Sequence, residues 1–432
     1  MNRLGTLVRA NIRNYGMILA LVVVIIVFTA WSGGRFISPF NVTALMNQTA
    51  VVGVMAAGMT LVIIIRHIDL SVGFLSGFMG ACAAILMMSW GVPPLPAILI
   101  VLALGAAIGF VLGWLIGKVG IPAFVVTLGA MIASHGLLLL STSASGTIQI
   151  MKQDTGFFNS LGAMTEDGFI PPIARVGGMS LSTIIIGAIG ITVFVIVQIR
   201  SRATKVRYNF TVPALWAFIA KLVVIAAVIG FVLYKLAMFS GISWTLVILA
   251  IVTFVMAFVM ERTRFGRHVY GIGGNPEAAL LSGVNVVKVT IIVFMIMEVL
   301  TALAGILYAS RMQAASPDAG MGFELLVIAG AFIGGCSPAG GVGKVTGSLV
   351  GALIMQSLVN GMLLMHVNIS VQYVIQGVIL VVAVLFDILA RRSRVVASDP
   401  GTSRPPEPSS LVLPLTGTAS QGSEYIAAPG TE

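Results

Sequence analysis

The sequence is short of charged residues. Asp, Glu, Lys and Arg together make up 9% of its 432 residues, whereas an average soluble domain carries about 25%. Hydrophobic residues make up 58%, and the mean hydropathy is +1.07. So few charges exclude a soluble globular protein, and the composition predicts a membrane protein.

Cysteine and histidine are scarce as well. The two cysteines lie in separate apolar stretches, and their spacing is not that of metal ligands. They also imply no disulfide framework. The histidines are scattered, whereas a metal site needs donors that cluster. We therefore expect no metal and no cofactor in this chain. The residues concerned are Cys82, Cys336, His67, His135, His268 and His366.

Acidic residues are outnumbered, with 14 Asp and Glu against 24 Lys and Arg. In a soluble protein this balance would suggest a nucleic-acid partner. Here the basic residues fall in short loops between apolar runs, where they act as signals of membrane orientation. We therefore expect no nucleic-acid partner.

Long apolar runs dominate the chain. Runs of about 17 to 25 apolar residues are long enough to cross the hydrocarbon layer. The fold class that they predict is an all-α, polytopic membrane helix bundle of about 10–12 transmembrane helices. The runs near 70–90 and 324–340 are the weakest, because glycine and polar residues interrupt them. The candidates lie near 17–31, 49–65, 70–90, 95–117, 121–141, 179–199, 213–238, 243–260, 289–310, 324–340, 343–364 and 370–390.

Basic clusters predict the orientation of these runs. If every cluster is cytoplasmic, both termini are inside and the number of crossings is even: twelve, or ten if the two weak runs are re-entrant. The first run lacks a clear small-residue cleavage site, so we expect an uncleaved span and not a signal peptide. The clusters are Arg3, Arg9 and Arg13; Arg200, Arg202, Lys205 and Arg207; Arg262, Arg264 and Arg267; and Arg391, Arg392 and Arg394.

The chain divides into a transmembrane domain, 1–394, and a tail, 395–432. Within the domain, residues 142–178 are expected to form an ordered or partly helical external loop, and 261–288 a cytoplasmic loop. The tail is rich in Pro, Ser, Gly and Thr and cannot bury a core, so we expect it to be disordered and cytoplasmic.

A faint internal repeat suggests two weakly related halves. The stretches VGFLSG (72–77) and VGKVTG (342–347) share the pattern Val-Gly-x-x-[Ser/Thr]-Gly. Many transporters are built from two related halves. With 49 glycines in the chain, a chance match explains the pattern equally well, so both interpretations stay open.

The stretch HIDLSVGFLSG (67–77) places Asp69 between two apolar runs. One interpretation makes it part of a broken-helix substrate path, with Asp69, Ser71, Gly73 and Gly77 as hinge or pathway candidates. The other makes Asp69 the cap of a helix at the membrane surface, which needs only local sequence.

A second candidate stretch is GGCSPAGGVGKVTGSLVGAL (334–353). Its glycines permit non-helical backbone at membrane depth, which makes Gly341, Gly343 and Gly347 pathway or hinge candidates. Glycine at 343, 347 and 351 also fits a smooth ridge for close helix packing. The stretch fails as a Walker motif, because Pro338 and Val345 occupy two required positions. If ATP drives this protein, another chain must bind it.

Glu298 lies inside the apolar run 289–310. An intramembrane carboxylate is a candidate proton or ion relay. The simpler interpretation is a buried carboxylate that is hydrogen-bonded to a Ser, a Thr or the backbone of a neighbouring helix, because the sequence shows no second carboxylate or basic partner at that depth.

A short helix is predicted between two glycine-rich turns in GGNPEAALLSG (273–283). Asn275 is the cap, Pro276 the first helical residue, and Glu277 a favourable charge in the first turn. Gly283 ends the helix. Such a short helix is not stable alone, so it docks either on its own domain or into a groove of a partner.

These residues carry a family resemblance. Glu277-Ala278-Ala279, three residues and Gly283 resemble the Glu-Ala-Ala-x-x-x-Gly loop of bacterial ABC importer permeases. The stretches RTRFGRHVYGIGGNPEAALLSGVNV, IDLSVG (68–73) and GGVGKVTGSLVGAL (340–353) resemble the ribose/xylose/arabinose branch, and xylose-type permeases most. The resemblance covers about 15–392, including the extra hydrophobic pair near 179–238.

The resemblance implies the membrane-spanning subunit of an ATP-driven monosaccharide importer in the bacterial inner membrane. Asn275, Pro276, Glu277, Ala278, Ala279 and Gly283 would form the coupling helix that inserts into a separate ABC ATPase subunit. Two permease copies, a periplasmic sugar-binding protein and membrane lipid would be the other partners. Two alternatives stay open: an ion-coupled secondary transporter using Glu298 or Asp69, and a structural or receptor-like membrane protein.

Overall fold

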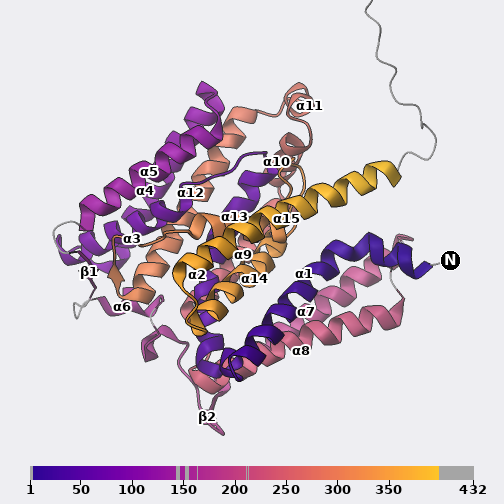
Figure 1. Cartoon of the computed structure of the whole chain (residues 1–432), viewed down its shortest axis with the longest axis horizontal. Coiled ribbons are helices and arrows are strands. Elements are labelled where there is room, and N and C mark those ends of the chain that lie inside the picture. The colour runs from indigo at the N-terminus through magenta and orange to yellow at the C-terminus, as the bar shows by residue number, and fades with distance from the viewer. Residues whose placement is uncertain are drawn as a thin grey trace, which may run out of the picture. The chain divides into compact units, whose positions relative to one another are not determined.

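The computed structural model describes residues 3–142, 146–150, 155–162, 164–210, 212 and 214–397. Within these residues nearly all regular structure is helical, and eight helices are long and apolar enough to cross a membrane (Figure 1). The fold class is therefore an all-α polytopic membrane bundle, as predicted. The helices are α1 (Arg3–Trp31), α2 (Pro39–Ile64), α3 (Val72–Met88), α4 (Pro94–Trp114), α5 (Ala123–Thr142), α6 (Gly156–Ser160), α7 (Leu181–Arg207), α8 (Leu215–Phe239), α9 (Trp244–Arg262), α10 (Arg264–Gly274), α11 (Pro276–Leu281), α12 (Val286–Met312), α13 (Phe323–Ile333), α14 (Val345–Leu364) and α15 (Ile369–Ala397).

All twelve candidate runs contain a helix, but three boundaries differ from the prediction. Helix α2 begins at Pro39, ten residues early, because Ser38 caps it by accepting a hydrogen bond from the Asn41 amide at 3.3 Å. Helix α13 stops at Ile333, where Gly334 and Gly335 follow. Helix α7 continues to Arg207, so the basic residues expected in a loop lie on its last turns. Residues 398–432 lie outside the described part, so the tail stays a prediction.

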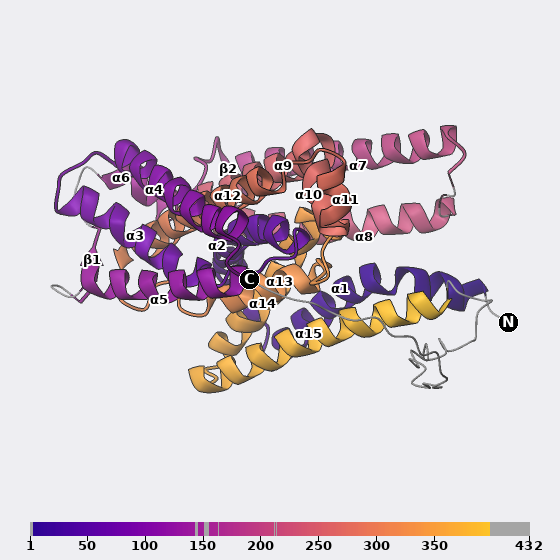
Figure 2. The same ribbon diagram turned by 90° about the horizontal axis from the view of Figure 1, so that it is seen from above.

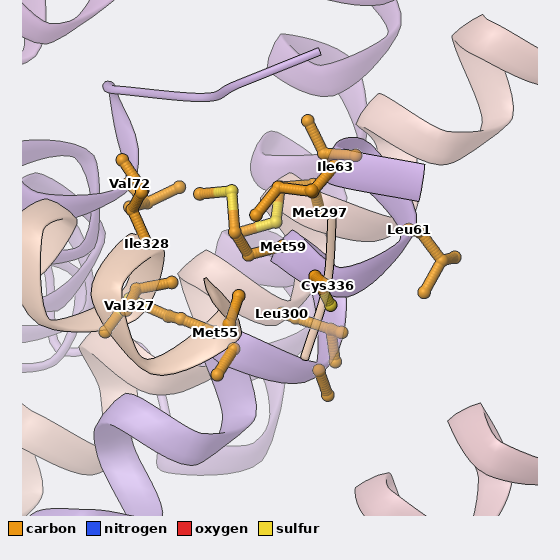
Figure 3. Close-up of a cluster of buried hydrophobic side chains, with 14 of the residues drawn as sticks. Met55, Met59, Leu61, Ile63, Val72, Met297, Leu300, Val327, Ile328 and Cys336 are labelled. Carbon is orange, nitrogen blue, oxygen red and sulfur yellow. The ribbon is translucent and has the colours of Figure 1, made fainter. Parts of the chain in front are cut away.

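Helix α2 forms the centre of the core. Every residue from Thr49 to Ile65 is buried, which means that the helix is covered on all sides. It packs on α12, α14, α9, α8 and α13. Figure 3 shows the contact among Met55 and Met59 of α2, Met297 and Leu300 of α12, and Val327 and Ile328 of α13.

The helices α10 and α11 lie at one end of the bundle, called here the α11 face, and α6 with short strands lies at the other, the α6 face (Figure 1). On the α6 face β1 (Ile148–Gln149) pairs antiparallel with β4 (Ala314–Ala315), and β2 (Arg175–Val176) pairs with β3 (Met179–Ser180). The 3-10 helix Glu166–Gly168 lies in the same loop. The described part of 142–178 thus contains two short helical segments, and its external position stays a prediction.

The pair α7–α8 contrasts with α2. The two helices lie side by side in both views (Figures 1 and 2). Only Leu236 and Ala237 of α8 are buried. Helix α8 also packs on α2 and contacts β3. Both helices therefore leave most of their apolar surface uncovered by the rest of the described chain.

Glycine lets the backbones of α3 and α12 touch. A Cβ added at Gly305 of α12 would overlap the carbonyl oxygen of Ser76, and one at Gly80 would lie 2.8 Å from the carbonyl oxygen of Gly305. Small residues allow such close approach between membrane helices, where dispersion contacts drive association.

We expect Gly305→Ala to separate α3 from α12 and to destabilise the fold by about 1–3 kcal/mol, the usual cost of overpacking. The measurement is the midpoint of thermal unfolding in detergent. Gly129→Ala on α5 is the control, because nothing lies within 4 Å of a Cβ at that position. Equal midpoints for the two variants would contradict the packing argument.

Candidate functional site

The helix predicted from GGNPEAALLSG is present as α11. The Asn275 side-chain oxygen accepts a hydrogen bond from the Ala278 amide at 3.0 Å, and Pro276 is the first helical residue. Glu277 lies in the first turn, where its charge complements the free amides. Local sequence therefore accounts for the start of α11.

The end of α11 is equally well determined. Gly283 has φ +82°, its amide donates to Leu280 O at 2.9 Å, and the Val284 amide donates to Ala279 O at 3.0 Å. This pair of hydrogen bonds is the Schellman arrangement, which favours glycine at the left-handed position.

The two faces of α11 differ. Ala279 is buried in the main hydrophobic cluster of the bundle, so it anchors the short helix to its own domain. Leu280 and Leu281 are 62% and 89% exposed, and Glu277 and Ala278 are exposed too. The docked face explains why so short a helix is stable, and the outward face offers a small apolar and acidic surface.

The helix α10 ties α11 to the bundle through a junction of glycine backbones. A Cβ at Gly273 would overlap Ile64 O at the end of α2, and one at Gly341 would lie 3.0 Å from the Gly274 nitrogen. The Gly341 amide donates to Ile64 O at 2.9 Å. We call Ile64, Gly273, Gly274, Gly340 and Gly341 the glycine junction.

A tyrosine strengthens this junction. The Tyr270 hydroxyl donates to Gly343 O at 2.9 Å. Burial raises the pKa of Tyr270, so the phenol keeps the proton that it donates. Gly343 was expected on a helical ridge, which is wrong for this residue: it precedes α14, and its space is limited by Cys336 and Ile64.

The structure brings together two carboxylates that are 229 residues apart. Asp69 and Glu298 are both fully buried. Asp69 Oδ1 accepts from the Ser71 amide at 2.8 Å and from Ser71 Oγ at 2.6 Å, and Ser71 Oγ lies 3.2 Å from Glu298 Oε1. Since Ser71 has one hydroxyl proton, it can satisfy only one carboxylate at a time.

This cluster corrects two expectations. Glu298 has a carboxylate neighbour that its own sequence surroundings do not show. Asp69 is not the residue that caps α3: it is buried, and Ser71 is the residue that precedes the first turn of that helix. The expectation that Glu298 is hydrogen-bonded to a Ser is confirmed.

The other glycine candidates make close backbone contacts. Gly73 faces Gly320 O and the Glu324 side chain, and Gly77 faces Ala319. Gly347 packs on Gly334, and Gly351 on Gly330, so the ridge expected on α14 fits α13. Packing explains these glycines, and a role in a pathway stays a prediction.

The comparisons with known proteins agree with these features. The family described as branched-chain amino acid transport system / permease component matches residues 41–384. The chain belongs to this permease family. The permease is 37% identical to the xylose transport system permease protein XylH of Haemophilus influenzae, over 87% of this chain and 96% of that protein.

Two further relatives are similar over most of their length. XylH of Escherichia coli K12 is 37% identical over 88% of this chain and 93% of its own. The ribose import permease protein RbsC of the same organism is 32% identical over 86% and 92%. No solved structure matches the permease. Its family and its apolar helices make it a multi-pass inner-membrane protein and a transport subunit, not an enzyme.

Sequence reasoning missed a polar seam between α2 and α14 of the permease. The side-chain Nδ2 of Asn41 donates to Asn360 Oδ1 at 2.9 Å, and Gln48 Oε1 accepts from Gln356 Nε2 at 3.1 Å and from Asn360 Nδ2 at 3.2 Å. These side-chain amides pair between α2 and α14. The sequence around either helix does not predict the pairing, because the partners lie far apart in the chain. Such pairs stabilise membrane helices by about 0.6 kcal/mol each on average.

We expect Gly283→Val to loosen α11 without unfolding the permease. A β-branched residue at a left-handed position costs about 1–2 kcal/mol, so amide exchange over 276–284 should rise roughly tenfold. Hydrogen–deuterium exchange with mass spectrometry measures this. Gly271→Ala is the control, because nothing lies within 4 Å of a Cβ there; unchanged protection in Gly283→Val would refute the role of Gly283.

Proposed function

We propose that the permease is the membrane-spanning subunit of an ATP-driven importer of monosaccharides, with a pentose such as xylose as the first candidate substrate. The observation that carries the proposal is α11. It is a capped helix anchored by Ala279, with Leu280 and Leu281 turned outward. Its occurrence in a relative of xylose and ribose permeases supports a mechanical role.

In this proposal Asn275, Pro276, Glu277, Ala278, Ala279 and Gly283 form the coupling helix. Its exposed face fits into a groove of a separate ABC ATPase subunit, and closure of the ATPase pair moves α10 and α11. The glycine junction passes this motion to α2 and α14. The permease itself breaks no bond, and its work is a change of helix positions.

The proposal also assigns sides and partners. The α11 face is cytoplasmic, because basic residues mark the cytoplasmic side of a membrane protein. Helix α10 carries Arg264 and Arg267, and the last turns of α7 carry Lys205 and Arg207. Both termini are then cytoplasmic. The α6 face receives sugar from a periplasmic binding protein, two permease copies form the channel, and lipid surrounds them.

We expect Glu277→Arg to weaken binding of the ATPase subunit at least tenfold, because charge reversal at a small interface can cost several kcal/mol. Co-purification with the co-expressed ATPase and uptake of radiolabelled D-xylose measure the effect. Glu166→Arg is the matched control for ATPase binding, being an exposed charge reversal on the opposite, α6 face. ATPase binding equal to that of the control would overturn the coupling role of α11.

The buried carboxylates favour a second candidate, an ion-coupled secondary transporter. A mid-membrane carboxylate pair is typical of proton or cation relays. An ATP-driven importer needs no such titration, so we expect Glu298→Gln to keep uptake within about twofold of the parent, as for a conservative change that retains a hydrogen-bonding side chain. Uptake in proteoliposomes without any ATPase, abolished by Glu298→Gln, would establish the second candidate instead.

A further inference from the structure

Arg66 occupies a backbone position that favours glycine. It follows the end of α2 with φ +67°, its amide donates to Ile63 O at 2.9 Å, and the His67 amide donates to Val62 O at 3.0 Å. This is the Schellman arrangement again, with Arg66 where Gly283 stands after α11. A residue other than glycine pays a conformational cost at a left-handed position, so the contacts of the Arg66 side chain decide whether it has a role.

The guanidinium of Arg66 binds the end of α10. Its Nε donates to Gly273 O at 2.9 Å, and its Nη2 donates to Gly274 O at 2.7 Å. These are the last two carbonyls before Asn275, the cap of α11. A cation complements the negative end of a helix, and the planar fork of arginine can hold two acceptors at once.

A third segment restricts the arginine stem. A Cβ at Gly340 would overlap Arg66 Cγ and lie 2.8 Å from Gly273 O. The stem therefore lies between the 340–341 turn and the end of α10. Arg66 is exposed, so its charge remains hydrated on the α11 face. The two hydrogen bonds fix the orientation of the guanidinium.

The chain beyond Arg66 leads directly to the buried carboxylates. Three residues later comes Asp69, and Ser71 joins Asp69 to Glu298 of α12 at the start of α3. A displacement of Arg66 would thus act on the segment that positions α3. Neither carbonyl bound by Arg66 belongs to α2, so these two bonds link separate elements.

We propose that Arg66 is the positioning residue that transmits movement of the coupling helix to α2 and α3. The inference rests on the proposed function, since it presumes an ATPase that moves α11. It assigns the transmission to two hydrogen bonds at one side chain, in addition to the packing of the glycine junction.

The decisive variant is Arg66→Gly, which removes the guanidinium while giving the backbone the residue it favours. The complete importer, with ATPase and binding protein, is reconstituted in liposomes and supplied with D-xylose. We expect ATPase binding to stay within about twofold, as for other surface substitutions. Uptake and sugar-stimulated ATP hydrolysis should fall by roughly tenfold, a usual size for coupling between sites.

The matched control is His366→Gly. His366 has φ +54°, follows α14 in the same arrangement through Leu363 O and Met362 O, and is exposed on the far end of that helix. His366→Gly makes the same change to the backbone as Arg66→Gly, but it removes no hydrogen bond to α10. Arg66→Lys should give intermediate uptake, because one amine cannot reproduce the fork.

Uptake in Arg66→Gly equal to that in His366→Gly would overturn the inference. So would loss of ATPase binding together with uptake, because that result would make Arg66 a structural support of α11. Failure of the proposed function is a separate outcome, recognised when the unmodified permease transports sugar without the ATPase.

Discussion

The close approach of three backbones at the glycine junction is the constraint on which the α11 face depends. Ile64 O accepts the Gly341 amide, and a side chain at Gly273 would fill the same space. In a membrane bundle, non-helical backbone is tolerated only where protein or water satisfies its polar groups. The junction meets this condition where α2 ends and before α14 begins. As a result, α10, α2 and the 340–341 turn cannot move independently.

The buried carboxylates impose a second constraint. Among the described residues, Asp69 Oδ2 and Glu298 Oε2 have no hydrogen-bond partner, and burying a polar group without a partner is costly. The packing of α3 on α12 through Gly305 brings them together, so the cost is offset by contacts elsewhere along the same two helices.

Local signals predicted much of this molecule. Apolar runs located the eight described helices that are long and apolar enough to cross a membrane. Asn275, Pro276 and Gly283 predicted α11, because caps and turns depend on neighbours within a few residues. Contacts between distant segments could not be predicted that way. Nothing near Glu298 indicates Asp69, and nothing near Arg66 indicates Gly274. The boundary of α2 was missed because hydropathy weights apolar side chains, whereas Ser38 starts the helix through one polar bond. The functional roles of α11 and of the pathway glycines stay predictions.

The exposed leucine at the end of α11, Leu281, matters for the permease before it assembles with other subunits. Leu281 is 89% exposed, and covering such a side chain is worth about 1.5–3 kcal/mol. In the proposed assembly the ATPase subunit covers this apolar tip, whereas a permease without its ATPase exposes it to water.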